Sequence, residues 1–520
     1  MRGLRRDHLR RLGGRQGRLG LGGDLPPPPP GRRHTGAALL GRGAGRVDLN
    51  VASDLDLGAA TIINLGERIR RRELSPVDVI EATNERIERL QPVLHSFVTH
   101  CGDYALERAR QAEREIAANR YRGPLHGIPY TLKDVIATRG VRTTFGNPRG
   151  VDYRPPEQAT LHRLLEEAGA ILVGKVVSEI GRDTRGPVGC RNAWDPSRSP
   201  GTSSSGSGSA TAASLGLLSI GTDTGGSVRH PGSNSNLVAM KPTFGRISRH
   251  GIWAASWSDD TAGPLTKTVE DNAAALEAIG IYDPLDPLSV NEPPSDYRAG
   301  LGDGIAGVRV GVPVDDWIWR DWLSEEEEGI ARAAIERLGE LGAALSEVRM
   351  PLAEHARNRA LGLSLASERP VFIRDHFSED EIEAWTEIHP QIEAGEAQPF
   401  EQYLHRQQFR ARITQEASAV LREVDVIAMP TGSTYGDAWD AETVVIRGRE
   451  VQARSRGVYR NGVASVSGHP AISVPCGFGN DDRWPVGLML HGRPLEEALL
   501  YRVAYAYEQS TDWRLRQPPL

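Results

Sequence analysis

Lysine is scarce in this chain of 520 residues. Of its 62 basic residues only four are lysines, namely Lys133, Lys175, Lys241 and Lys267. Arginine serves as well as lysine where a cation is only solvated at a surface, but arginine does not give up its proton in proteins. A lysine kept against this bias is therefore a candidate for chemistry that needs a neutral amine.

Cysteine and long apolar runs are also lacking. The three cysteines, Cys101, Cys190 and Cys476, are too few and too scattered for a disulfide framework or a zinc site. A reducing compartment and a cytoplasmic location are therefore expected. No apolar run approaches the roughly 20 residues that a membrane span needs, so no membrane contact is expected.

The net charge of −6 conceals an uneven distribution. Residues 1–50 contain eleven arginines and three aspartates and contribute +8, which leaves −14 on the other 470 residues. An acidic body argues against a broad nucleic-acid-binding surface. The interpretation preferred here therefore includes no nucleic-acid partner.

The chain divides into a tail and one large body. Residues 1–46 are rich in Arg, Gly and Pro and have no apolar periodicity, which predicts a disordered tail. Residues 47–520 are predicted to form a single domain. In this body apolar strands alternate with helical patterns, which indicates an α/β fold. Helices are expected near 76–90, 105–119, 161–168, 206–215, 268–279, 323–341, 352–423 and 495–508, and strands near 170–173, 217–220, 308–312, 424–429, 471–474 and 486–490.

Three polar residues occur in distinctive surroundings. Lys133 is flanked by apolar residues that predict burial, Ser203 lies in the Ser/Gly-rich stretch 200–209, and Ser227 follows Gly225 and Gly226. Together they can supply a base, a relay hydroxyl and a nucleophile, and the neighbouring glycines leave backbone N–H groups free to bind an oxyanion. Each feature alone has an ordinary explanation, namely a surface lysine, a flexible linker and a tight turn.

Other signals are weaker. Residues 169–175 match most of a phosphate-binding loop, but Val176 stands where that motif needs Ser or Thr, so a buried strand ending at Gly174 is preferred. Asp223-Thr-Gly225 resembles half of an aspartic protease site without a second copy. No Gly-x-Ser-x-Gly elbow surrounds Ser203 or Ser227.

These stretches resemble the amidase signature family, which cleaves carboxamides with a Ser–cis-Ser–Lys triad. The resemblance extends from about Ala59 to Arg514, and its motifs are matched by Gly127–Lys133, Pro200–Gly206 and Gly221–Arg229, with further echoes in 241–246, 263–271 and 468–475. It implies a large, mixed, twisted β-sheet covered by helices on both faces. Thr202 and Ser205 replace glycines of the family pattern, and 177–183 differs from many relatives, so the resemblance leaves the substrate open.

The resemblance assigns a role to each site residue. Ser227 is expected to be the nucleophile, Ser203 the relay after a cis peptide bond, and Lys133 the base. The N–H groups of Thr224, Gly225 and Gly226, with that of Ser227, are expected to bind the oxyanion, and the supporting residues are expected to be Ser204, Asp223 and Arg229. No cofactor and no metal is expected.

Three functions remain open from the sequence. The preferred one is a stand-alone hydrolase of linear amides that acts on a small-molecule substrate through an acyl-enzyme; a homodimer is one assembly open to it. The second is the glutaminase subunit of a tRNA-dependent amidotransferase. The third is a non-catalytic binding protein, against which the intact Lys133, Ser203 and Ser227 argue.

Overall fold

The computed structural model describes residues 55–145, 152–179, 189–293, 295–356, 360, 362–432, 437–453, 460–479 and 483–520. The predicted tail, residues 1–46, lies outside this range, so the division into a tail and one domain stays a prediction. Among the described helices, none is both long enough and apolar enough to cross a membrane.

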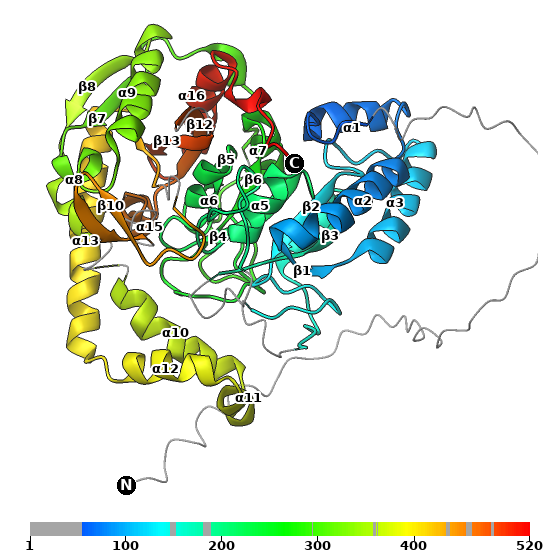
Figure 1. Cartoon of the computed structure of the whole chain (residues 1–520), viewed down its shortest axis with the longest axis horizontal. Coiled ribbons are helices and arrows are strands. Elements are labelled where there is room, and N and C mark those ends of the chain that lie inside the picture. The colour runs from blue at the N-terminus through cyan, green and yellow to red at the C-terminus, as the bar shows by residue number, and fades with distance from the viewer. Residues whose placement is uncertain are drawn as a thin grey trace, which may run out of the picture. The chain divides into compact units, whose positions relative to one another are not determined.

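An 11-stranded sheet runs through the described part of the chain (Figure 1). The strand order is β1-β3-β2-β4-β6-β5-β12-β13-β9-β7-β8, and β10 and β11 form a separate hairpin. The strands are β1 (Phe97–His100), β2 (Pro129–Lys133), β3 (Ile171–Val176), β4 (Leu218–Asp223), β5 (Val238–Lys241), β6 (Thr261–Thr266), β7 (Arg309–Pro313), β8 (Ala344–Val348), β9 (Val426–Pro430), β10 (Thr443–Ile446), β11 (Arg449–Gln452), β12 (Ala471–Gly479) and β13 (Trp484–Gly492).

The sheet is mixed in a regular way. Strands β3, β2 and β4 are parallel neighbours, and so are β9, β7 and β8 at the other end. The strands between these two groups pair in antiparallel fashion. The large mixed sheet predicted from the sequence is therefore confirmed.

Helices pack on both faces of this sheet. Along β3, Leu172 belongs to one apolar core, whereas its neighbours Ile171 and Val173 belong to a second core. This alternation is expected of a strand buried on both faces. The first core also takes in apolar residues of α4, α7, α9 and α16, and the second takes in residues of α2, α3 and α5.

Side-chain hydrogen bonds cap the first turn of some of the helices. Ser75 caps α2 by accepting from the Val77 N–H, with Pro76 in the first turn, and Ser324 and Glu327 form a capping box on α9. The helices are α1 (Ile62–Arg70), α2 (Pro76–Leu94), α3 (Gly102–Ala117), α4 (Thr160–Glu167), α5 (Ser205–Ala212), α6 (Arg229–Asn234), α7 (Val269–Ile279), α8 (Asp316–Trp319), α9 (Glu325–Glu340), α10 (Gly362–His376), α11 (Glu379–Ala384), α12 (His389–Glu396), α13 (Phe400–Glu423), α15 (Gly462–Ser467) and α16 (Glu497–Gln509).

Most of the strands and helices named from the sequence are present, with shifted ends, but two details differ. Residues 169–175 contain the expected buried strand, yet β3 does not end at Gly174 and continues through Lys175 to Val176. Lys175 remains in the strand because its ammonium is satisfied there by the Ile136 carbonyl at 2.6 Å and the Thr143 hydroxyl at 2.9 Å. Strands β1, β2, β5, β6, β8, β10 and β11 were not among the expected elements.

Close packing of small residues brings the three motifs together. β2 and β4 are parallel neighbours, so their carboxyl ends, Lys133 and Asp223, lie at the same edge of the sheet. Helix α5 packs tightly at this edge: a Cβ on Gly206 would lie 2.4 Å from the Val177 nitrogen, and one on Gly221 would lie 2.7 Å from Ser204 Oγ. The Gly/Ser stretch is therefore a buried helix and not a flexible linker.

Candidate active site

Lys133 ends strand β2 with its side chain fully inside the protein. Its Nζ donates to Ser203 Oγ at 2.6 Å and to Thr222 Oγ1 at 2.8 Å, and the residue is 1% exposed. Burial lowers the pKa of Lys133 to about 7, although the carboxylates of Asp260 and Asp223 counteract part of this effect. A substantial neutral fraction, which can accept a proton, is therefore available near neutral pH.

Ser203 is held just before helix α5. The Thr202–Ser203 peptide bond is cis, and the Ser203 carbonyl accepts from the Glu179 N–H at 2.9 Å. The next residue, Ser204, accepts from the Thr222 N–H at 3.3 Å and donates to the Thr222 carbonyl at 3.2 Å. Ser204 therefore fastens the start of α5 to β4, while the Ser203 hydroxyl meets Lys133.

Ser227 lies in the turn between β4 and α6. Gly226, immediately before it, has φ of 116°, and an added Cβ there would lie 2.5 Å from Asn461 Cβ. Only glycine fits this conformation and this space. Ser227 is partly exposed and makes no hydrogen bond to another residue in the described part of the chain. The structure thus joins Lys133 directly to Ser203, but it records no bond from either to Ser227.

The buried carboxylate of Asp223 forms hydrogen bonds with several groups of this turn. Its carboxylate accepts from the Gly226 N–H at 2.7 Å and the Val228 N–H at 3.2 Å, and it pairs with both Nε and Nη2 of Arg229. Burial raises the pKa of Asp223, but the charge and hydrogen bonds of Arg229 outweigh burial and bring it to about 2. Arg229 Nη2 also reaches Ser465 Oγ at 2.9 Å, which ties the turn to α15.

The backbone donors of the turn are not equivalent. The Gly226 N–H, which the sequence suggested for an oxyanion, is engaged by the Asp223 carboxylate. The N–H groups of Thr224, Gly225 and Ser227 donate to no other described residue and remain available to a ligand. Gly226 is therefore better placed to shape the turn than to bind an oxyanion directly.

Two residues near Lys133 were missed by the sequence reasoning. Thr222 supplies the second hydrogen bond of the lysine, and it stands inside the Gly-Thr-Asp motif, where it could have been noticed. Asp260, 5% exposed, accepts from the Thr224 hydroxyl and from the N–H groups of Ala255 and Ser256. Burial raises the pKa of Asp260 to about 6, although these donors counteract part of the rise. No sequence signal distinguished Asp260 from other acidic residues.

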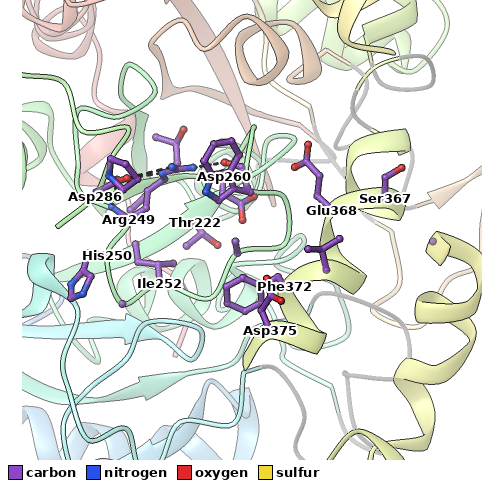
Figure 2. A pocket seen from close by; sticks show the side chains of 18 of the residues that line it. Thr222, Arg249, His250, Ile252, Asp260, Asp286, Ser367, Glu368, Phe372 and Asp375 are labelled. Carbon is purple, nitrogen blue, oxygen red and sulfur yellow. Dashed lines mark hydrogen bonds and ion pairs between the residues drawn. The ribbon is translucent and has the colours of Figure 1, made fainter. Parts of the chain in front are cut away.

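A cavity of about 780 Å³ opens beside this edge of the sheet (Figure 2). Thr222 and Asp260 form part of its wall, and the 249–262 segment and helices α10 and α13 provide most of the rest. Lys133, Ser203 and Ser227 are not among the lining residues, but Thr222, which accepts from Lys133 Nζ, is one of them. This volume suits a small organic molecule.

Buried ion pairs hold the helical wall of the cavity against the 249–262 segment. Arg406 of α13 donates to Asp259 at 2.8 Å and to Glu368 of α10 at 3.2 Å. Glu368 in turn accepts from the hydroxyls of Ser256 and Ser258, both at 2.7 Å. Asp259 and Asp260 are adjacent, so this network leads from the helices to the residue that contacts Thr224.

Comparison with known proteins finds relatives that match most of this chain. Residues 78–501 match the family model described as Amidase. A glutamyl-tRNA(Gln) amidotransferase subunit of Moorella thermoacetica is 34% identical over 499 residues, which span 90% of this chain and 99% of that protein. An amidase of Pseudomonas putida is 34% identical over 465 residues, which span 88% of this chain and 98% of that protein.

Solved structures extend the likeness to the fold. The native peptide amidase of Stenotrophomonas maltophilia superposes with a TM-score of 0.75 at 28% identity, over 89% of this chain and 98% of that one. The family model covers most of the chain, and the likeness to these relatives spans nearly their whole length. The chain therefore belongs to the amidase signature family.

Proposed function

We propose that this protein hydrolyses a carboxamide to a carboxylate and ammonia or an amine, with Ser227 as nucleophile. The observation that carries the proposal is the 2.6 Å hydrogen bond between Lys133 Nζ and Ser203 Oγ, made by a buried lysine whose pKa lies near 7. This pair is a base already in contact with a hydroxyl relay, and the nucleophile candidate follows the neighbouring strand.

Attack begins with neutral Lys133. Ser227 Oγ adds to the carbonyl carbon as its proton moves to Ser203, and Ser203 gives a proton to Lys133 Nζ. The carbonyl oxygen becomes an oxyanion, which the N–H groups of Thr224, Gly225 and Ser227 can stabilise. Each such donor contributes about 3–4 kcal/mol in comparable sites.

The second half of the reaction reverses the relay. The C–N bond breaks as Lys133, through Ser203, returns a proton to the leaving nitrogen, which leaves an acyl ester on Ser227. Water then adds to this ester and gives a proton to the same relay. The bond between the acyl carbon and Ser227 Oγ breaks as the relay returns that proton to Ser227 Oγ, and the carboxylate leaves. Asp223 and Arg229 take no proton in this scheme and serve to hold the turn that carries Ser227.

Covalent labelling tests the nucleophile. A fluorophosphonate should add one phosphonyl group per chain, and peptide mapping should find it on Ser227. The Ser227→Ala variant should remain folded, take no label and release no ammonia from amides. Labelling of another serine, or hydrolysis by the alanine variant, would contradict the assignment.

A glutaminase subunit is the second candidate, because the full-length relative from Moorella thermoacetica is a subunit of an amidotransferase. In that case the chain would need partner proteins. Glutamine hydrolysis should then be slow for the chain alone and should rise strongly when the partner proteins and charged tRNA are added. A stand-alone amidase would show no such activation.

A further inference from the structure

The cavity beside the triad is suited to the bulky part of a substrate. Its wall includes Thr222, whose hydroxyl lies 2.8 Å from Lys133 Nζ, so a molecule in the cavity is one side chain away from the catalytic base. A volume of about 780 Å³ is far larger than an amide group alone requires. What the cavity can accept therefore depends on the chemistry of its wall.

Much of that wall is apolar and accessible. Trp257, Val371 and Phe400 line the cavity and are 54%, 59% and 76% exposed, although side chains of this kind are usually buried. Phe372 also lines it and packs against Trp253 with ring centroids 5.4 Å apart, which fixes this face of α10. Such a surface favours an aromatic or branched apolar group.

Among the described residues that line the cavity, none offers a free cation to an anionic ligand. Arg249 is the only arginine or lysine among the described residues that line it. Its guanidinium pairs with Asp286 at 3.4 Å and donates to the Trp257 carbonyl. His250 also lines the cavity.

Negative charge, by contrast, is in excess. Four carboxylates line the cavity, namely those of Asp260, Asp286, Glu368 and Asp375. Arg249 pairs with Asp286 and Arg406 pairs with Glu368, whereas Asp260 and Asp375 form no ion pair with another described residue. Figure 2 shows Asp375 beside Phe372 in the wall.

One further cation lies near but not in the wall. Arg369 of α10 feels the charge of Asp260, yet it donates to Gln391 at 2.6 Å. It is not among the lining residues, whereas Glu368, Phe372 and Asp375 of the same helix are. With 100° between successive helical positions, Arg369 lies to one side of the face that these three share.

From these charges and this apolar wall we infer that the cavity selects amides whose bulky part is aromatic or branched and is neutral or cationic, and that it rejects substrates with a free carboxylate, including glutamine. A substrate carboxylate buried in the cavity would lie near Asp260 and Asp375, which form no ion pair with another described residue, and no cation of the described wall would offset its desolvation cost. This inference rests on the proposed amide hydrolysis, and it separates the two candidate functions.

Matched substrates test the sign of the charge. The α-carboxamides of N-benzoyl norleucine, N-benzoyl lysine and N-benzoyl glutamate are similar in size but differ in side-chain charge, and free glutamine serves as a fourth, smaller compound. At pH 8.5 and low salt, kcat/KM from ammonia release should be at least about tenfold higher for the norleucine and lysine amides than for the glutamate amide. Equal or faster hydrolysis of the glutamate amide or of glutamine would overturn the inference.

Reversing the charge of Asp375 in the cavity wall tests whether the wall sets the preference for substrate charge. Relative to kcat/KM for the norleucine amide, Asp375→Arg should raise kcat/KM for the glutamate amide and lower it for the lysine amide. Asp380→Arg makes the same charge change on α11, outside the lining residues, and should leave the order of the three amides as it was. An order that Asp375→Arg does not alter would contradict the proposed role of the cavity.

Protection from labelling covers the case of slow turnover. The norleucine and lysine amides should slow fluorophosphonate labelling of Ser227 at concentrations where the glutamate amide has no effect. Labelling that none of the compounds slows, or that the glutamate amide slows best, would overturn the inference while leaving the nucleophile in place. Failure of Ser227 to label at all would instead count against the proposed function.

Discussion

Two neighbouring regions of this protein are built on different principles. The motif region, made of β2, β4, α5 and the turn at Ser227, is buried and joined by short polar contacts such as those of Asp223 with Gly226 and Arg229. The cavity region, made of the 249–262 segment and helices α10 and α13, leaves Val371 and Phe400 largely exposed. The difference indicates that the chemistry is fixed by local motifs, whereas substrate choice is set by surfaces assembled from distant parts of the chain.

The strongest test of the motif region replaces its base. Lys133→Arg keeps a positive charge but removes the proton acceptor, so we expect it to lower kcat by about 10³-fold or more, nearly as much as Lys133→Ala. The measurement is kcat on the best amide, with folding checked by circular dichroism. Lys267→Arg is a control, because that lysine only donates to backbone carbonyls at the Leu57–Gly58 turn. Substantial activity in Lys133→Arg would show that Lys133 supplies charge alone.

Substitutions in the cavity region should change substrate binding and the stability of the protein more than they change kcat. Arg406→Met would leave the buried carboxylates of Asp259 and Glu368 short of a partner, which costs about 3–5 kcal/mol in comparable cases. We expect a lower melting temperature and a KM that rises more than kcat falls. Arg412→Met, on the exposed face of the same helix, should change neither. A fall in kcat alone would show that the two regions are not separable in this way.

Asp260 connects the two regions, and its removal should shift a pH profile. Activity needs neutral Lys133, so the rate should rise as pH increases through the lysine's pKa of about 7. The Asp260 carboxylate favours the protonated lysine, so Asp260→Asn should lower that pKa and move the acid limb of the kcat profile to lower pH. An asparagine can still accept from Ala255 or Ser256 and donate to Thr224. A limb that moves to higher pH, or stays in place, would contradict the coupling.

The motif region could be predicted from sequence because each of its candidate residues lies in a recognisable local stretch of the chain. Lys133, Ser203 and Ser227 each have a recognisable neighbourhood, and the predicted burial around Lys133 is confirmed. Strand β2 itself was not predicted, since it is only five residues long and begins with Pro129. The hydrogen bond from the Gly226 N–H to the Asp223 carboxylate also could not be predicted from the sequence.

The cavity region could not be predicted for a physical reason. Glu368 meets Ser256 across 112 residues of sequence, and Arg406 meets Asp259 across 147. No local pattern marks such pairs, because charged residues on a helix are most often solvated. Asp260 stands beside Asp259 in the sequence, yet one pairs with α13 and the other contacts the turn before Ser227.

The smallest effect is expected at the beginning of the chain, outside both regions. Residues 1–46 lack the apolar side chains needed to pack on either region, and the resemblance to the family starts after them. A chain that starts at Asp48 should therefore keep kcat, KM and melting temperature within about twofold or a few degrees of the full chain. The measurement is best made with neutral and cationic amides, because the tail carries eleven of the chain's arginines and could attract anionic substrates nonspecifically. If the shortened chain folds normally but its KM rises, the tail contributes to the cavity region. If its kcat falls instead, the tail acts on the motif region.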